Sequence, residues 1–229
     1  AKKICVAYTG MEKFFPAEKI ILTGNPVRQG LFEHVPSRDE AMRTYGFDSD
    51  KKTILILGGS LGARSINQCL TNNLELIRSS IDVQFIWQTG KIYHEQIINT
   101  MKTANKIPNL YVTDFIKDMT IAYTVADLII SRAGAGSISE FCLLRKAVIL
   151  IPSPNVAEDH QTKNAMALVN KQAAICVKDP EANEMLLLTA LKTVHDDETL
   201  ERLRTNIATL ALPDSADVIA KEVCKLKPV

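Results

Sequence analysis

The amino-acid sequence predicts an α/β fold in which a parallel β-sheet is covered by helices on both faces. The first observation is a repeated alternation of strand-like and helix-like segments along most of the chain. The second is that some strand-like segments, such as residues 54–57 (ILIL) and 128–130 (LII), are uninterrupted apolar runs. Parallel strands that are buried on both faces have this composition. Together the two observations favour a doubly wound parallel sheet.

The start of the chain does not follow this alternation. Residues 3–8 and 20–22 read as short strands, and a turn-rich junction of Thr, Gly, Asn and Pro follows at 23–26. Two strands alone are marginally stable in water. We therefore expect residues 1–24 to be the remnant of an N-terminal domain with its interdomain junction, and residues 25–229 to form one complete domain.

The regular part begins with a helix that has clear start and stop signals. Ser37 and Glu40 form a capping box, and Gly46 is placed to end the helix. Beyond it we expect strands at residues 53–57, 83–88, 110–113, 128–131, 147–151 and 174–178. The helices between them are expected at residues 63–77, 92–103, 119–126, 137–145 and 161–170. Three further helices are expected at residues 182–194, 199–210 and 215–225, the last with Ser215 as its N-cap.

Composition excludes several classes of protein. The 229 residues include 27 Lys and Arg against 26 Asp and Glu, and 46% are hydrophobic, which is typical of a globular domain and not of a disordered one. The net charge of +1 gives no sign of a nucleic-acid partner. Apolar runs such as residues 147–151 are far shorter than the ~20 residues of a membrane-spanning helix. The first five residues lack the apolar core of a signal peptide.

Cysteine and histidine give no metal-binding pattern. The five cysteines are widely spaced and never form a C-x-x-C motif, and the four histidines never form H-x-x-x-H. Asp48-Ser49-Asp50 matches a short metal-binding motif of some glycosyltransferases, but it lies between Gly46 and two lysines, where a solvated turn is expected. We therefore expect no metal site, no cofactor and no disulfide framework.

Two glycine-rich loops follow predicted strands, at the sheet edge where ligands bind in open parallel sheets. The first, residues 58–62 (GGSLG), leads into a helix whose free amides and dipole favour an anion. No Gly-Lys-Ser/Thr follows, so the loop is not a Walker A motif, and its spacing is not that of a dinucleotide fingerprint. The alternative is a tight turn in which glycine serves packing alone.

The second loop, residues 132–136 (RAGAG), approaches a dinucleotide motif but lacks its third glycine. Glu140 follows it, and we expect this carboxylate in the first helical turn, where it could accept hydrogen bonds from vicinal ribose hydroxyls. The alternative is a carboxylate that only stabilises the helix dipole. Two anion-binding loops on one sheet suggest a shared diphosphate, and thus a nucleoside diphosphate-sugar rather than ATP.

Five motifs in register carry a resemblance to a known family. They are residues 24–28 (GNPVR), 58–63 (GGSLGA), 115–119 (FIKDM), 132–140 (RAGAGSISE) and 159–165 (DHQTKNA). In this combination the chain resembles the MurG family of bacterial N-acetylglucosaminyltransferases. The resemblance covers essentially the whole chain, but only the C-terminal half of such an enzyme. It implies the C-terminal, Rossmann-like domain of a two-domain GT-B fold, which holds the nucleotide-sugar.

The resemblance assigns parts of the donor UDP-GlcNAc to residues of this chain. Arg28 and the backbone of Ile116 would bound the uracil. Ser60 and residues 135–137 would hold the diphosphate, and Glu140 would bind the ribose hydroxyls.

The resemblance places the GlcNAc-binding residues at the start of the helix expected at residues 161–170. Gln161, with His160, would read the GlcNAc hydroxyls, although a polar helix start explains the same residues equally well. His160 stands where the family commonly has glutamine. The complete set of implied donor-binding residues is Arg28, Ser60, Ile116, Ala135, Gly136, Ser137, Ile138, Ser139, Glu140, His160 and Gln161.

The resemblance also implies a reaction and a location. The acceptor 4-hydroxyl of lipid I would displace UDP from C1 of GlcNAc with inversion and form lipid II in peptidoglycan synthesis. The acceptor site, the catalytic residues and the membrane-binding face would belong to the N-terminal domain, so no catalytic residue is expected in this chain. The full-length enzyme would be a peripheral protein on the cytoplasmic face of the bacterial inner membrane.

Two alternatives stay open. One is another transferase or an epimerase that acts on UDP-sugars, which the junction at residues 25–28 disfavours. The other is a non-catalytic nucleotide-binding module that works with a partner chain.

Overall fold

A six-stranded parallel sheet forms the centre of the computed structural model, which describes residues 1–8, 10–102, 106–156 and 159–226. In the order β5-β4-β3-β6-β7-β8 the strands are Leu110–Thr113, Val83–Gln88, Lys52–Leu57, Leu128–Ser131, Val148–Leu150 and Ile175–Cys176. All neighbours pair in parallel. With β3 counted as the first strand, this is the 3-2-1-4-5-6 order of dinucleotide-binding folds. The predicted doubly wound sheet is confirmed.

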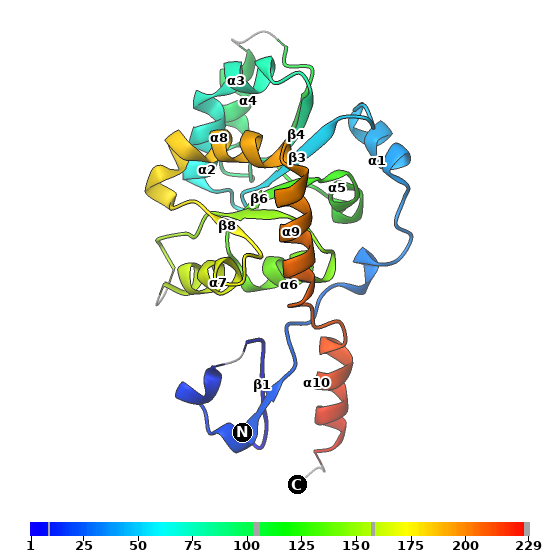
Figure 1. The fold of residues 1–229 in the computed structure, drawn as a ribbon, viewed down its shortest axis with the longest axis vertical. Helices are drawn as coiled ribbons and strands as arrows, with labels where there is room; N and C mark the ends of the chain where they lie inside the picture. The colour runs from blue at the N-terminus through cyan, green and yellow to red at the C-terminus, as the bar shows by residue number, and fades with distance from the viewer. Residues whose placement is uncertain (9, 103–105, 157–158, 227–229) are drawn as a thin grey trace.

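Helices cover both faces of this sheet (Figure 1). One face carries α2 (Arg64–Asn72), α3 (Leu74–Ser79), α4 (His94–Lys102) and α8 (Ala182–Val194). The other carries α1 (Arg38–Tyr45), α5 (Met119–Val125), α6 (Ala135–Leu143) and α7 (His160–Val169). Ile54 and Ile56 of β3 join the first hydrophobic core, and Leu55 and Leu57 join the second. This alternation explains why the strand had to be apolar at every position.

The start of α1 follows the sequence closely. Ser37 is the N-cap, its hydroxyl accepts from the Glu40 amide, and the Glu40 carboxylate accepts from the Ser37 amide at 3.0 Å. The helix ends at Gly46 with φ of 67°, a left-handed conformation that suits glycine. The predicted turn at Asp48 is also present, since Asp48 Oδ1 accepts from the Asp50 amide.

Several predicted boundaries were wrong. The helix predicted at 63–77 is divided into α2 and α3 at Asn73, whose side chain donates to the Cys69 carbonyl oxygen. The helix predicted at 137–145 begins at Ala135, so Glu140 lies in its second turn and not in its first. Strands β7 and β8 are shorter than predicted, at Val148–Leu150 and Ile175–Cys176. The predicted helix end at Thr103 lies outside the described residues.

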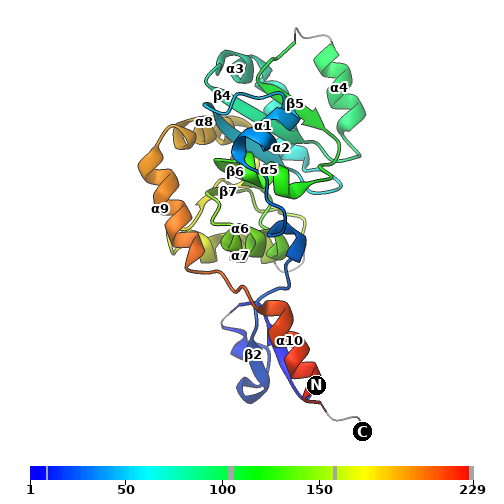
Figure 2. The ribbon, with the colours of Figure 1, turned by 90° about the vertical axis from the view of Figure 1, so that its right-hand side faces the viewer.

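The first residues form a small separate unit. Strands β1 (Ile4–Val6) and β2 (Ile20–Leu22) pair in parallel, and the 3-10 turns η1 (Met11–Lys13) and η2 (Ala17–Lys19) lie between them. This unit lies below the large sheet in both views (Figures 1 and 2).

The C-terminal part of the chain returns to this unit. Helix α9 (Asp197–Ala208) packs on the large domain, and α10 (Ser215–Cys224) then runs beside β1 and β2 (Figures 1 and 2). The N-cap of α10 is Asp214 and not Ser215, whose hydroxyl instead donates to the Leu212 carbonyl oxygen at 2.8 Å. Of the helices in the described part of the chain, none has the length and apolar character needed to cross a membrane.

Candidate functional site

The two glycine loops meet at the centre of the sheet. Strands β3 and β6 are neighbours, with Leu57 opposite Ser131 at their carboxyl ends. From β3 the chain continues to β4 on one side, and from β6 it continues to β7 on the other side. This reversal of strand order creates the crevice in which open α/β sheets bind ligands. Both loops that the sequence singled out therefore open into one crevice.

The loop after β3 needs its glycines for close backbone packing. Gly59 and Gly62 have φ values of 79° and 90°, and a Cβ on Gly62 would clash with the Thr89 carbonyl oxygen and the Tyr93 ring. Ser60 is exposed at the tip. No side chain caps the N-terminus of α2, which leaves the first amides of that helix without a side-chain acceptor. Such a helix start favours an anion.

The loop after β6 opens a second helix in the same way. Gly134 is the N-cap of α6 and makes no side-chain capping bond. A Cβ on Gly136 would meet no atom within 4 Å, so that side of the first turn is open. Ser139 donates to the Ala135 carbonyl oxygen and accepts from Asn25 Nδ2 at 3.1 Å, which ties the junction after residue 24 to this helix. The side chain of Ile138 is buried in the core.

Glu140 is held by two side chains. Tyr123 donates its hydroxyl to Glu140 Oε2 at 2.6 Å, and Arg28 Nη2 donates to Oε1 at 3.3 Å. The glutamate side chain is only 16% exposed, whereas that of Arg28 is 65% exposed. Burial and the adjacent carboxylate both raise the pKa of Tyr123, so the phenol stays protonated and acts as a donor. The sequence analysis missed Tyr123, because a tyrosine on an amphipathic helix reads as a core residue.

Gln161 supports the second loop through its carbonyl oxygen. Its Oε1 accepts from the amides of Ala133 and Ser153 at 3.2 and 2.9 Å. Asn164 donates to the Ala133 carbonyl oxygen at 3.1 Å. These two side chains of α7 thus fix the loops that follow β6 and β7. His160, the first residue of α7, is exposed.

Ile116 is also engaged before any ligand arrives. Its amide donates to Gln88 Oε1 at 3.0 Å, and its side chain is buried. The backbone of Ile116 is therefore already fixed by a neighbouring strand. Gln88 is a second residue of the site that the sequence analysis missed.

Arg132 is a support of the site and not a free cation. Its guanidinium pairs with Asp179, donates to the Ile151 carbonyl oxygen at 3.1 Å and donates to Ser65 Oγ at 3.1 Å. Ser65 Oγ in turn donates to Asp179 Oδ1 at 2.6 Å. This network joins the ends of β6 and β7 to the start of α2.

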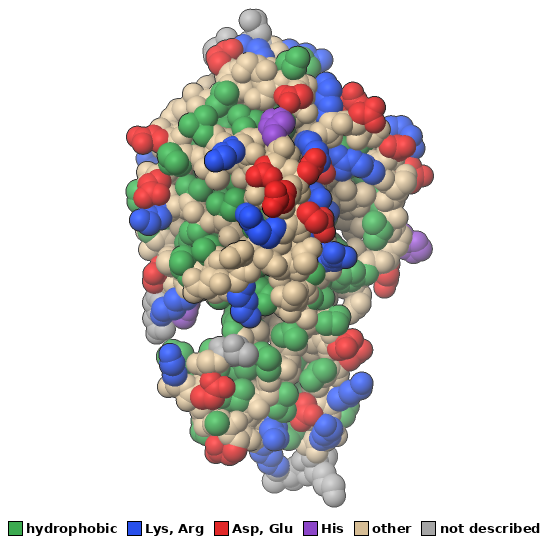
Figure 3. Space-filling model, viewed as in Figure 1, with side chains coloured by type: hydrophobic (Ala, Val, Ile, Leu, Met, Phe, Trp, Pro, Cys, Tyr) green, Lys and Arg blue, Asp and Glu red, His purple; other side chains and the backbone are tan. Residues whose placement is uncertain are grey.

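A cavity of about 1140 Å³ lies between the N-terminal unit and helices α6 and α7. The second glycine loop and the start of α7 contribute Gly134, Ala135, Gln161 and Asn164 to its wall. Lysines 13, 163 and 171 also line it, and its described lining includes no carboxylate. Figure 3 shows a gap at this level on the left side of the molecule. The lysines bring positive charge to an otherwise largely apolar wall.

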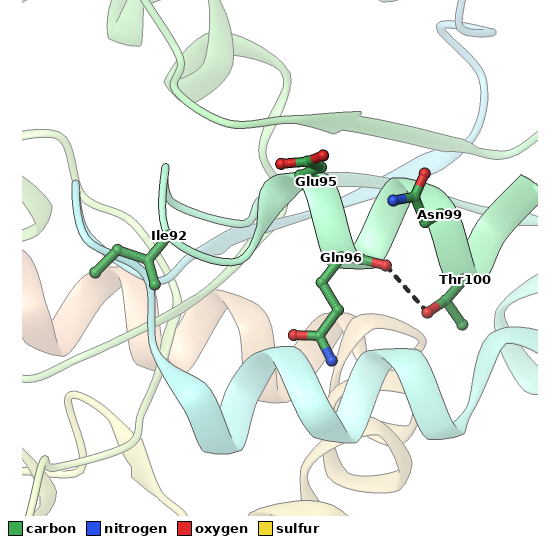
Figure 4. Close-up of a pocket in the computed structure, with 5 residues that line it drawn as sticks. All are labelled: Ile92, Glu95, Gln96, Asn99 and Thr100. Carbon is green, nitrogen blue, oxygen red and sulfur yellow. Dashed lines mark hydrogen bonds between the residues drawn. The ribbon is translucent and has the colours of Figure 1, made fainter.

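A second hollow, of about 700 Å³, does not belong to this site. Ile92 and the α4 residues Glu95, Gln96, Asn99 and Thr100 line it, and Figure 4 shows them along a single helix and the turn before it. None of the implied donor-binding residues lines it. Within the part of the chain that the structure describes, no three His, Cys, Asp or Glu side chains gather closely enough to hold a metal ion.

Comparisons with known proteins identify the relatives of this chain. Residues 53–219 match the model of the glycosyltransferase family 28 C-terminal domain. The chain is 70% identical over 226 residues to a Bacteroides fragilis protein named UDP-N-acetylglucosamine–N-acetylmuramyl-(pentapeptide) pyrophosphoryl-undecaprenol N-acetylglucosamine transferase. A protein of the same name from Bacteroides thetaiotaomicron is 65% identical. The alignments cover 99% of this chain but only about 60% of these relatives.

Solved structures give the same picture. The crystal structure of Acinetobacter baumannii MurG matches 99% of this chain with a TM-score of 0.75 and 28% identity, and 61% of that chain is covered. A UDP-GlcNAc 2-epimerase from Neisseria meningitidis, bound to UDP-GlcNAc, matches 94% of this chain and 58% of its own with a TM-score of 0.67. At 15% identity the epimerase shows a shared fold alone.

Proposed function

Since residues 53–219 match the C-terminal domain of glycosyltransferase family 28, the chain belongs to that family, and we propose that it is the donor-binding part of a lipid II-forming enzyme. That enzyme transfers GlcNAc from UDP-GlcNAc to lipid I in peptidoglycan synthesis. The observation that carries the proposal is the pair of uncapped helix starts, α2 and α6, that flank the central crevice of the sheet. This arrangement fits a diphosphate bound without a metal.

The donor would lie across the crevice from one loop to the next. The diphosphate would occupy the starts of α2 and α6, near Ser60 and residues 135–137. The carboxylate of Glu140, already oriented by Tyr123, would accept hydrogen bonds from the ribose hydroxyls. The uracil would lie at Ile116, whose carbonyl oxygen is the backbone group that Gln88 leaves available.

For Gln161 and Arg28, the contacts in the free protein limit which of their atoms could bind the donor. Because Gln161 Oε1 holds the amides of Ala133 and Ser153, Gln161 would meet the sugar through its Nε2 donor. Arg28 would reach the ligand beside Glu140, its partner in the free protein. His160 at the rim completes the sugar end of the site.

In the reaction, the residues of this chain would stabilise the leaving group. Negative charge develops on the diphosphate as the bond from C1 of GlcNAc breaks. Amides and helix dipoles that already point at this position stabilise that charge without reorganisation. The groups that activate the acceptor hydroxyl would belong to the N-terminal domain, of which we propose residues 1–24 are the remnant. The whole enzyme would be peripheral to the cytoplasmic face of the inner membrane.

Binding of UDP by the chain itself is the first test. Calorimetric titration should show UDP and UDP-GlcNAc binding, and Glu140→Ala should weaken UDP by about 1–3 kcal/mol, since a hydrogen bond to a charged group is lost. The wild-type chain should prefer UDP over 2′-deoxy-UDP, whereas Glu140→Ala should bind both equally. Tight NAD binding without UDP binding would overturn the proposal. Equal UDP affinity in the variant would leave Glu140 as a structural carboxylate only.

A chimeric protein tests whether donor binding and acceptor activation belong to different domains of the enzyme. We expect the chain alone to form no lipid II from UDP-GlcNAc and lipid I. Fusion to the part of the Bacteroides fragilis relative that this chain does not cover should restore transfer, because the two proteins are 70% identical over the 226 aligned residues. Lipid II formation by the isolated chain would refute the proposed division.

A further inference from the structure

We propose that Gln88 is a positioning residue that sets the separation between the loop for the diphosphate and the loop for the base. The inference rests on the proposed function, since it takes residues 58–62 as the diphosphate loop and residues 114–116 as the base loop. Gln88 itself touches neither part of the ligand in this arrangement.

The contacts of Gln88 reach both loops from one buried side chain. Its Nε2 donates to the Gly59 carbonyl oxygen at 3.1 Å, and its Oε1 accepts from the Ile116 amide at 3.0 Å. The residue is only 5% exposed. It is the last residue of β4, which lies between β3 and β5 in the sheet.

The side chain continues the sheet beyond its end. In the strand register Gln88 lies opposite Leu57 on one side and Thr113 on the other, and both of these are the last residues of their strands. Past this point the strands separate into loops. The amide of Gln88 supplies one donor to the loop after β3 and one acceptor to the loop after β5, as a backbone peptide would. It therefore adds a side-chain link between two loops that are joined to the end of β4 by only a few further backbone hydrogen bonds.

The residues that follow Gln88 limit how far these loops can adjust. The Gly90 amide donates to the Asp114 carbonyl oxygen at 3.1 Å, and the Lys91 amide donates to the Ser60 carbonyl oxygen at 3.3 Å. A Cβ on Gly90 would clash with the backbone of Gly62. Gln88 is thus the one side chain of residues 88–91 that bonds to both loops in the described structure.

A nucleoside diphosphate needs both loops at once, with its base on one and its diphosphate on the other. Loops that already have the correct separation bind it without an ordering cost. Loss of the Gln88 contacts should therefore weaken a ligand that spans both loops more than a ligand that uses one loop. A residue that only stabilises the fold would instead affect the binding of both kinds of ligand equally.

The chain provides a matched control on the same strand. Gln84 is 4% exposed, accepts from the Asp48 amide at 2.7 Å and donates to the Asp48 carbonyl oxygen at 2.8 Å. It also joins β4 to a loop by a buried amide, but at the opposite end of the strand. Gln84→Met and Gln88→Met therefore remove the same kind of contacts at different distances from the crevice.

The experiment measures by titration how tightly UDP, uridine and inorganic diphosphate bind to the wild type, to Gln88→Met and to Gln84→Met. Gln88→Met should weaken UDP about tenfold, which corresponds to ~1.4 kcal/mol, while uridine and diphosphate change less than about threefold. Gln84→Met should leave all three affinities unchanged. Gln88→Glu, which keeps an acceptor for Ile116 but no donor for Gly59, should also weaken UDP selectively and provides the test if Gln88→Met does not fold.

The outcomes separate this inference from the proposed function. Failure of the wild-type chain to bind UDP would refute the proposed function. If the wild type binds UDP and a folded Gln88 variant binds it equally well, Gln88 is not a positioning residue. The same conclusion follows if uridine affinity falls as much as UDP affinity, because the effect would then lie in the base loop alone.

Discussion

Glu140 illustrates how this site is built residue by residue. The carboxylate is oriented before any ligand arrives, by a buried phenol on one oxygen and an exposed guanidinium on the other. Gln161 and Gln88 likewise use part of their hydrogen-bonding capacity on backbone groups of the loops. Glu140 and Gln161, which we propose contact the ligand, are thus themselves part of the hydrogen-bonded frame of the site, and Gln88 belongs to that frame alone. Such supports fix a site within the narrow tolerance that binding requires.

Tyr123→Phe removes one of these supports without removing the ring. We expect UDP to bind several-fold more weakly, by roughly 1 kcal/mol, because Glu140 loses the donor on its buried oxygen. The preference for UDP over 2′-deoxy-UDP should shrink as well, and calorimetry measures both. The edge-on contact of Tyr123 with Phe141, at 6.1 Å between ring centres, should remain.

Tyr45→Phe is the control for this substitution. Tyr45 is also a partly buried tyrosine, packed edge-on against Tyr111 at 4.9 Å between ring centres, but it lies on α1, and Glu140 is not among the groups that raise its pKa. Its substitution should leave UDP affinity unchanged. An equal loss of affinity in both variants would attribute the effect to general stability and not to Glu140.

At the scale of elements, start and stop signals predicted α1 well and other helices less well. The capping box and Gly46 fix both ends of α1 through local hydrogen bonds. The start of α6 lacks a side-chain cap: its N-cap is Gly134, and the helix begins at Ala135. An uncapped start has no local sequence signal, which is why Glu140 was expected in the wrong turn. The same absence of a cap leaves amides available to a ligand.

The end of α8 makes a pH-dependent contribution to stability. His195, its C-cap, bonds through Nδ1 to the Leu191 carbonyl oxygen and through Nε2 to Asp82 Oδ2, each at 2.7 Å. The Leu191 carbonyl first and the Asp82 carboxylate second raise the pKa of His195, and the hydrogen bond to His195 lowers the pKa of Asp82.

The signs of these two shifts define a pH window. The histidine contribution is complete below its unfolded pKa of about 6.5 and is lost as the pH rises through the raised value. The aspartate contribution is present above about 3.9 and is lost as the pH falls through the lowered value. We expect His195→Gln to lower the unfolding free energy most between about pH 4 and 6.5. Urea unfolding of the wild type and of His195→Gln across this range measures the difference in unfolding free energy. A difference that does not change with pH would contradict a stabilising interaction between His195 and Asp82.

At the scale of the whole molecule, two chain connections cross at one point. The segment that enters the large domain passes Gly24, and the segment that leaves it passes Leu212 and Ser215. Gly24 has φ of 79°, and a Cβ there would lie 2.5 Å from Ser215 Oγ and 2.8 Å from Leu212 Cβ. The close crossing holds α10 beside the N-terminal unit.

Gly24→Ala should loosen this crossing. The substitution adds a steric clash to the conformational strain of a positive φ, so we expect a loss of at least about 2 kcal/mol of unfolding free energy. Gly46→Ala is the control, because Gly46 has φ of 67° with no atom within 4 Å of an added Cβ. Chemical unfolding should show a clearly smaller loss for Gly46→Ala. Equal losses would mean that backbone strain alone explains the effect and that the crossing is not tight.

The sequence by itself determined the sheet, the sequence order of its elements and the two glycine loops. These features depend on local composition: apolar runs, turn residues and helix caps act over a few positions. Tertiary structure alone decided that Tyr123 orients Glu140, that Gln88 joins two loops and that the side-chain Oε1 of Gln161 accepts from the Ala133 amide. The partners Glu140, Ile116, Ala133 and Gly59 lie 17 to 29 residues away in the sequence, and only the fold brings them together. A buried glutamine or tyrosine carries no local signal that names such a partner, because only the folded sheet places the two side by side.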